Sequence, residues 1–235
     1  MIMPFHVTAW HCSANNRVLP HTLAHLCQQA ASDHADQLGF GFENLNRRGL
    51  LWALVVLRLE ILRQPRLGME LELSTWPSHV QRLRASREFR LTDRQGEVFM
   101  LGSSDWMVLD VQSRKAVDVA GLGFAPPVRG ERMLGDKLAR HKAEASGQEL
   151  ESWPVSLSAL DINGHVNNTE YVRSSHDALY RAGMRGEVGS LWMSFHSEAF
   201  LNDELRLLYI QMDAQHCIAG FREQTPVFSA VFTEK

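Results

Sequence analysis

Apolar positions recur at helical spacing early in the chain. The stretch starts near Pro20, whose fixed φ suits the first turn of a helix. Its apolar face holds Leu19, Leu23, Leu26, Cys27, Ala30, His34 and Leu38. Gly39 and Gly41 follow, and glycine commonly ends a helix because it adopts positive φ without strain. The pattern predicts one long helix that buries a single face.

A second helix with the same kind of apolar stripe is predicted late in the chain. Asn167 or Asn168 can cap its start, because an asparagine side chain accepts a hydrogen bond from the first helical N–H groups. Its apolar face holds Tyr171, Val172, Ala178, Leu179 and Ala182, and Gly183 lies beyond its end. The chain therefore contains two amphipathic helices.

Strand patterns precede and follow each helix. Before the helices we predict strands over Phe5–His11 and Trp153–Ala159. After the first helix we predict Leu50–Leu62, Gly68–Trp76, Val80–Leu91 and Glu97–Leu109; after the second we predict Ser190–Glu198, Asp203–Met212, His216–Phe221 and Val227–Phe232. Each half thus reads as a helix followed by an antiparallel meander.

The two halves can be laid over each other. When Asp161 falls on Ser13, Asn163 falls on Asn15 and His165 falls on Arg17, and strand, turn and helix coincide. A duplicated helix-plus-meander is an α+β arrangement. A helix wrapped by such a sheet is the hotdog arrangement, so we expect a tandem double hotdog.

The two predicted halves are separated by a stretch rich in glycine, proline and charge. We expect an N-terminal hotdog over residues 1–119, a linker over residues 120–150 and a C-terminal hotdog over residues 151–235. Within the linker, a short helix is predicted over Lys137–Ala145.

Composition narrows the function classes. A net charge of −3 lacks the basic excess of nucleic-acid binders. The longest apolar run, Leu50–Leu57, is too short to span a bilayer, and the N-terminus lacks the pattern of a signal peptide, so we expect no membrane association. Three scattered cysteines favour neither a disulfide framework nor a zinc knuckle, and a reducing cytoplasm is the simplest location.

The residues with the clearest chemistry form the run Asp161-Ile162-Asn163-Gly164-His165-Val166-Asn167-Asn168. If the backbone stays extended, alternation puts Asp161, Asn163 and His165 on one side. The following helix start presents N–H groups and the positive end of a dipole, which can polarise a carbonyl and stabilise an oxyanion. A nearby carboxylate or imidazole can deprotonate a water. The run predicts an active site, with Gly164, Val166 and Asn167 against the substrate.

This run resembles the active-site segment of hotdog thioesterases, above all the acyl-acyl carrier protein thioesterases of plants and bacteria. Supporting similarities in the first half are Pro65-Arg66-Leu67-Gly68, Thr75-Trp76, Trp106–Asp110 and Ser113-Arg114-Lys115. In the second half the pattern Asp-x-Asn-x-His-Val-Asn-Asn-x-x-Tyr matches in full. The resemblance covers nearly the whole chain.

The resemblance implies a further acidic catalytic residue, for which Glu198 is the matching position. Plant members carry a cysteine directly after this glutamate, but this chain has Ala199, which excludes a cysteine nucleophile there. Water activated by Asn163, His165 and a carboxylate is the better account. Whether Glu198 or Asp161 supplies the basic charge stays open at the level of sequence.

The expected activity is hydrolysis of the thioester between a fatty acyl chain and the phosphopantetheine arm of acyl carrier protein. No metal or cofactor is expected, and the protein is either a monomer or a homodimer. The first half has Ser13 and Arg17 where the second has Asp161 and His165, so we expect it to be non-catalytic and to enclose the acyl chain with strands that include Trp52. The alternatives are an acyl-CoA thioesterase of the hotdog class and a non-catalytic acyl-binding protein.

Two other groupings have simpler interpretations. His21 and His25 stand one helical turn apart, but without a third ligand a helix-face pair is favoured over a metal site. The row Arg82, Arg84, Arg87 and Arg90 could meet an acidic carrier protein, although a solvated strand face is its default interpretation.

Overall fold

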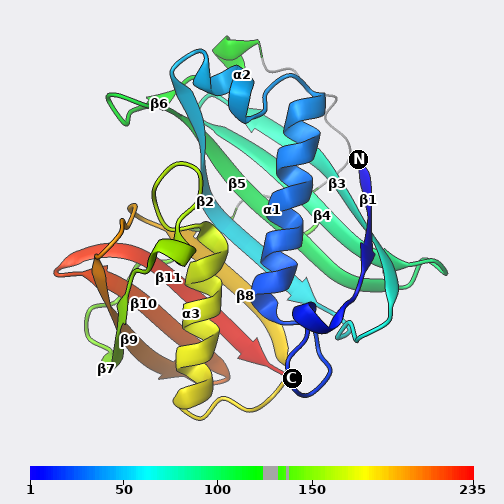
Figure 1. The fold of residues 1–235 in the computed structure, drawn as a ribbon, viewed down its shortest axis with the longest axis vertical. Coiled ribbons are helices and arrows are strands. Elements are labelled where there is room, and N and C mark those ends of the chain that lie inside the picture. Colours follow the sequence, from blue (N-terminus) through cyan, green and yellow to red (C-terminus); the bar gives the residue numbers. More distant parts are fainter. Residues whose placement is uncertain (124–131, 136–137) are drawn as a thin grey trace. The chain divides into compact units, whose positions relative to one another are not determined.

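The computed structural model describes residues 1–123, 132–135 and 138–235. These divide into two compact units, one of Met1–Leu19 and His25–Leu138 and one of Pro20–Ala24 and Ala139–Lys235. In each unit a long helix lies on the face of an antiparallel sheet (Figure 1). The predicted α+β class is confirmed.

The sheet of the first unit has the strand order β1-β3-β4-β5-β2, and β6 pairs with β5. These strands are β1 (Ile2–His6), β2 (Leu50–Ile61), β3 (Glu70–Gln81), β4 (Arg84–Asp93), β5 (Val98–Asp110) and β6 (Ala116–Val117). The helical elements are η1 (Ala9–His11), α1 (Pro20–Gln37), α2 (Phe42–Asn46) and η2 (Ala120–Leu122). Leu26, Cys27 and Ala30 on α1 are buried, as their helical spacing predicts.

A group of charged side chains is buried in the first unit. Arg132 lies 2.5 Å from Asp105 and 3.7 Å from Glu88, and all three side chains are almost fully buried. The Met133 N–H also donates to Glu88, at 2.9 Å. Residues 132–133, which the sequence places in a linker, are therefore fixed to the strands β4 and β5.

The second unit has the strand order β8-β11-β10-β9-β7, with α3 in front of the sheet (Figure 1). Its elements are β7 (Gln148–Pro154), η3 (Leu157–Ala159), α3 (Asn168–Arg181), β8 (Val188–Phe195), β9 (Glu204–Met212), β10 (Gln215–Arg222) and β11 (Thr225–Glu234). The buried face of α3 carries Tyr171, Val172, Ala178 and Leu179. Phe228 and Phe232 on β11 are fully buried in the same unit.

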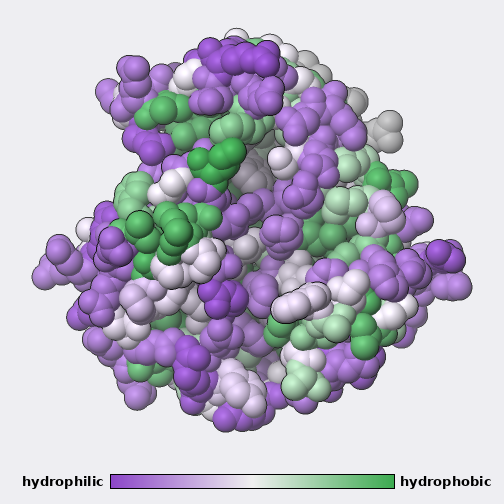
Figure 2. All heavy atoms as spheres, viewed as in Figure 1, coloured by the Kyte–Doolittle hydropathy of each residue, from purple (hydrophilic) through white to green (hydrophobic). Residues whose placement is uncertain are grey.

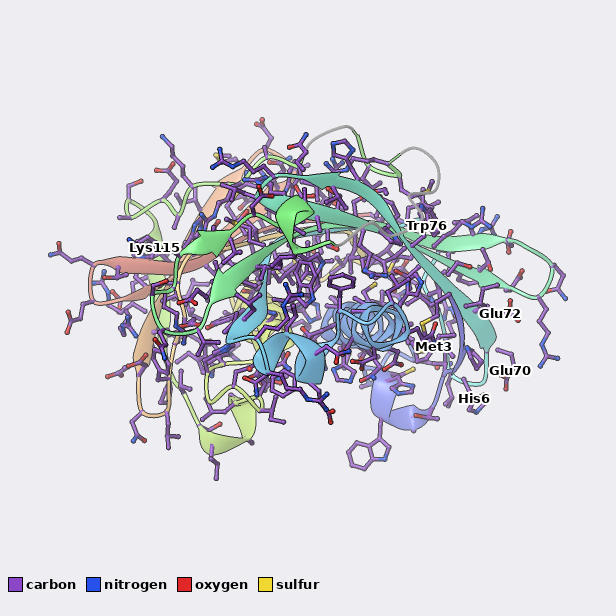
Figure 3. The ribbon with its side chains drawn as sticks, turned by 90° about the horizontal axis from the view of Figure 1, so that it is seen from above. Met3, His6, Glu70, Glu72, Trp76 and Lys115 are labelled. Atoms are coloured by element: carbon purple, nitrogen blue, oxygen red, sulfur yellow. The ribbon has the colours of Figure 1, made fainter. Side chains whose placement is uncertain are left out.

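The outer strand of the first unit's sheet, β1, ends in a polar contact. His6 on β1 pairs in register with Glu70 on β3, and their side chains meet at 2.5 Å (Figure 3). Proline on an edge strand, here Pro4, discourages pairing with further chains. Figure 2 shows apolar residues on the viewed face only as separate patches among hydrophilic ones. Among the described residues, no helix is long and apolar enough to cross a membrane.

Several predicted boundaries are wrong. β3 runs on to Gln81 and β4 starts at Arg84, whereas a strand was predicted from Val80. The predicted helix over Lys137–Ala145 is wrong for residues 138–145, which are not helical, because contacts with β8 and β11 hold this segment in an irregular path. β7 begins at Gln148, inside the predicted linker. The linker residues 124–131 and 136–137 lie outside the described part of the chain.

Candidate active site

The predicted catalytic run lies in the second unit, in a tight turn between η3 and α3. The Asp161 N–H donates to the His165 carbonyl at 2.9 Å, and the Gly164 N–H donates to the Asp161 carbonyl at 3.0 Å. Gly164 has φ +78°, a left-handed conformation that glycine adopts without a Cβ penalty. The turn folds the chain back on itself just before the helix starts.

The backbone of this turn is not extended, so the predicted alternation is wrong. Asp161 Oδ1 accepts a hydrogen bond from the Asn163 N–H at 2.7 Å, which closes an Asx turn. As a result the Asp161 and His165 side chains converge, while Asn163 stands at the exposed tip.

His165 lies between two carboxylates. Its Nδ1 is 3.8 Å from Asp161 Oδ1, and its Nε2 is 3.6 Å from Glu198 Oε1. The three side chains are largely but not fully buried, with 17% of His165 exposed. The structure thus brings together an imidazole and both carboxylates that the sequence singles out.

These separations exceed the length of a direct hydrogen bond, which is about 2.7–3.2 Å. A water at hydrogen-bonding distance from both His165 Nε2 and Glu198 can bridge a gap of 3.6 Å. Nδ1 faces two acceptors, Asp161 Oδ1 and, at 3.5 Å, the Val166 carbonyl. With its proton on Nδ1, the imidazole can donate to these acceptors. The lone pair on Nε2 is then directed toward the position of the bridging water.

The loop after β8 delivers Glu198 to this turn. The Val166 N–H donates to the Ala199 carbonyl at 2.9 Å, and His165 forms an isolated antiparallel bridge with Phe200. Ala199 is fully buried. The position that carries a cysteine in plant members is therefore filled by a buried methyl group.

The start of α3 is held by residues of the same run. Asn167 is the N-cap, and its Oδ1 accepts from the Thr169 N–H at 3.0 Å and from the Thr169 hydroxyl at 2.8 Å. The Asn167 N–H donates to the Ala159 carbonyl, and the Val166 side chain is buried. Since these N–H groups already have acceptors, fewer donors remain for a substrate oxygen. Substrate contacts by Gly164, Val166 and Asn167 stay predictions.

Tyr171, at the end of the motif, lies one helical turn inside α3. It is buried, and its ring packs edge-on against Trp153 at 5.9 Å. Burial raises the pKa of the Tyr171 phenol far above its usual range, the Ala199 N–H bonded to the hydroxyl lowers it, and the carboxylates of Glu198, Asp161 and Asp203 raise it further. The hydroxyl is therefore neutral and lies close to the acidic groups of the site.

Trp52, which the sequence assigns to the acyl pocket, lies in the first unit. Its Nε1–H donates to the Phe40 carbonyl at 2.8 Å, and its ring packs against a cluster of apolar side chains. The buried members of that cluster are Leu45, Leu50, Ala85, Val108 and Val119. Contact of Trp52 with substrate stays a prediction.

The first unit repeats the geometry of the turn. The Ser13 N–H donates to the Arg17 carbonyl at 2.8 Å and the Asn16 N–H donates to the Ser13 carbonyl at 3.0 Å, as in the second unit. The Val18 N–H donates to the Pro65 carbonyl, where Val166 donates to Ala199.

The alignment of Ser13, Asn15 and Arg17 with Asp161, Asn163 and His165 therefore holds in the hydrogen bonds of the backbone. It also makes Gln64 the counterpart of Glu198, a match that the weak sequence identity does not reveal.

The arginine row Arg82, Arg84, Arg87 and Arg90 does not form one solvated face. Arg87 is 7% exposed and bonds to Thr75 Oγ1 and to His34 Nδ1, so it is wrong to place it on a solvated, carrier-facing row. Burial lowers its pKa to about 10. Arg82 and Arg90 are exposed, and Arg84 pairs with Asp105. Within the described ranges, no three His, Cys, Asp or Glu side chains gather as a metal-binding set.

Comparison with known proteins places this chain in a family. A family model described as the acyl-ACP thioesterase N-terminal domain matches residues 3–121, about half of the chain. The chain belongs to the acyl-ACP thioesterase family.

Among curated proteins, it is 27% identical over 188 residues to oleoyl-acyl carrier protein thioesterase 1, chloroplastic, of Arabidopsis thaliana, a match that covers 72% of this chain and 51% of that protein. The chain thus spans about half the length of the curated relatives it matches.

Solved structures show the same mixed fold of helices and antiparallel sheet. An acyl-ACP thioesterase from Bacteroides thetaiotaomicron aligns with a TM-score of 0.88 at 22% identity, covering 100% of this chain and 97% of that one. The 12:0-ACP thioesterase from Umbellularia californica aligns with a TM-score of 0.85 at 17% identity, covering 100% and 96%. At these identities the likeness shows the fold alone.

Proposed function

We propose that this protein hydrolyses the thioester of a fatty acyl chain on acyl carrier protein and releases free fatty acid. We further propose that its two units are the halves of a tandem double hotdog, of which the second is catalytic. Membership of the acyl-ACP thioesterase family and the repeated turn geometry support both statements.

One observation carries the proposal. His165 lies between Asp161 and Glu198, at 3.8 Å and 3.6 Å, directly before the positive end of α3. An imidazole and a carboxylate can hold and deprotonate a water, while the helix start favours the negative oxygen of a tetrahedral intermediate. Thioester hydrolysis needs both an activated water and a stabilised oxyanion.

Glu198 is the base that we favour. Asp161 Oδ1 is engaged by the Asn163 N–H, so this carboxylate already holds the turn and faces His165 Nδ1. Glu198 faces Nε2, where a water can bridge the two side chains. Asp161 then keeps the imidazole oriented, and Glu198 takes the proton.

The reaction runs through ordinary acyl transfer. The bridging water attacks the thioester carbonyl as Glu198 accepts its proton. Asn163 at the turn tip donates to the oxyanion, and the positive end of the α3 dipole stabilises its charge. The carbon–sulfur bond then breaks, and the thiolate of the pantetheine arm takes the proton back from Glu198. The products are a fatty acid and a thiol, and the reaction as proposed consumes no cofactor.

In this proposal the first unit binds the acyl chain. Ser13, Arg17 and Gln64 occupy the places of Asp161, His165 and Glu198, so its turn offers neither an imidazole nor a carboxylate. Its apolar strands, including Leu51, Trp52 and Leu54 on β2, would enclose the chain. The reducing cytoplasm expected from the scattered cysteines is part of the same proposal.

The substrate preference is tested by comparing acyl-carrier and acyl-CoA substrates of graded chain length. We expect a higher kcat/KM for the carrier substrate, falling as salt rises, because an acidic carrier would be attracted by exposed cations such as Arg82 and Arg90. Equal values that do not respond to salt would indicate an acyl-CoA thioesterase instead. Binding of both without turnover would indicate a non-catalytic acyl-binding protein.

A further inference from the structure

The loop that carries Glu198 is closed by one side chain at its far end. Asp203 Oδ2 accepts from the Phe200 N–H at 2.8 Å, and the Asp203 N–H donates to the Phe200 carbonyl at 3.0 Å. Asn202, between them, has φ +67°. The loop between β8 and β9 is thus a defined turn that returns toward its own start.

Arg222, from β10, joins the two ends of this loop. Its Nη1 donates to Asp203 Oδ2 at 2.8 Å and, in a longer contact of 3.4 Å, to the carbonyl of Glu198 itself. Both side chains are about one-third exposed or less. Burial by itself raises the pKa of Asp203, but hydrogen bonds from the Phe200 N–H and Arg222 outweigh it, so the net pKa is lowered and the carboxylate stays charged.

We propose that Arg222 and Asp203 are positioning residues for catalysis, which act by fixing the main chain of Glu198. This inference rests on the proposed function, in which Glu198 is the base. The proposed water bridge requires the Glu198 carboxylate to stay near His165 Nε2, and their separation is 3.6 Å. A displacement of about 1 Å can cost about 100-fold in rate. Holding the Glu198 carbonyl from a neighbouring strand keeps its Cα in place.

If Arg222 and Asp203 only supported the fold, their variants would affect stability and not the reaction through Glu198. Partly exposed ion pairs stabilise a fold only weakly, so variants of this pair should remain folded. Their effect on the reaction would then come through Glu198 and should vanish when Glu198 can no longer act as a base. The coupling between the two sites separates positioning from general support of the fold.

The experiment is a double-mutant cycle of Arg222→Gln and Glu198→Gln in the full chain. We expect Arg222→Gln and Asp203→Asn each to lower kcat about 10-fold or more, with KM changed less than about 2-fold. The matched control is Arg206→Gln, which breaks the exposed pair with Glu149 on β7 and should leave kcat unchanged. In the Glu198→Gln background, Arg222→Gln should cause no further loss.

Two results would overturn the inference. If Arg222→Gln keeps full kcat while Glu198→Gln is impaired, the pair positions nothing, and the proposed base still stands. If the losses multiply in the double variant, Arg222 acts independently of Glu198. Failure of the proposed function looks different, because Glu198→Gln would then itself retain normal turnover.

Discussion

His165 Nε2 lies 3.6 Å from Glu198 Oε1, although the two residues come from separate segments, the turn before α3 and the loop after β8. The separation is too long for a direct hydrogen bond and suits a shared water. In the proposed mechanism this pair activates the water, and each residue around it then has a distinct expected effect.

Glu198→Gln should lower kcat by about 100- to 10,000-fold, because the amide keeps the shape but cannot accept the proton. Asp161→Asn should cost less than about 10-fold, since the asparagine Oδ1 can still accept from the Asn163 N–H. Steady-state kinetics at saturating acyl-carrier substrate measures both. If Asp161→Asn is the more damaging change, Asp161 is the base and the assignment reverses.

Asn163→Ala should lower kcat by about 100- to 1000-fold, the usual cost of removing one oxyanion donor. Asn15→Ala, at the matching position of the first unit, should leave turnover nearly intact because Arg17 and Gln64 stand where the second unit has an imidazole and a carboxylate. The two variants are matched controls in the same assay. Comparable losses from both would show two working sites.

Arg132→Met should destabilise the protein by about 3–5 kcal/mol, because it removes the buried guanidinium that lies beside both Asp105 and Glu88, and Arg84, which is partly exposed and 3.4 Å from Asp105, does not replace it. Arg63→Met removes an exposed partner of Glu97 and should cost less than about 1 kcal/mol. Urea unfolding followed by circular dichroism measures the difference. Equal midpoints for the two variants would show that Arg132 does not hold the chain to β4 and β5.

His196 should make stability depend on pH. Burial, together with the nearby Arg140, lowers its pKa from 6.5 to about 4. The unfolded chain therefore binds more protons between these values, and the contribution, present above pH 6.5, is lost as pH falls toward 4. Between pH 7 and pH 5, His196→Gln should lose less in melting temperature than the parent chain. Parallel losses would show that other groups set this dependence.

Much of the fold follows from local pattern. The helix after Pro20 and the strand Leu50–Ile61 form where apolar spacing places them, because each buries one consistent face. Boundaries fail where tertiary contacts decide, as for residues 138–145. There, Ser194 and Ser229 bond to the backbone of His141, and these contacts favour an irregular path over a helix.

In the site, too, the residues that are close in sequence are predictable, whereas those brought together by tertiary structure are not. Asp161 and His165 share one short turn, so their proximity is local and follows from sequence. Glu198 is indicated by the family resemblance, since no local spacing joins it to the turn. Arg222 carries no signal in the sequence, because only the pairing of β9 with β10 brings that strand beside the Glu198 loop.

The decisive test of the proposed function is release of free fatty acid from acyl-carrier substrate by the parent chain and by His165→Ala. We predict hydrolysis by the parent and a loss of about 100- to 1000-fold in kcat for the variant. KM and melting temperature should change little, since a partly exposed side chain in a turn supports little packing. Near-normal turnover by a folded His165→Ala protein would show that His165 is not catalytic, and no hydrolysis by the parent chain would rule out the proposed function.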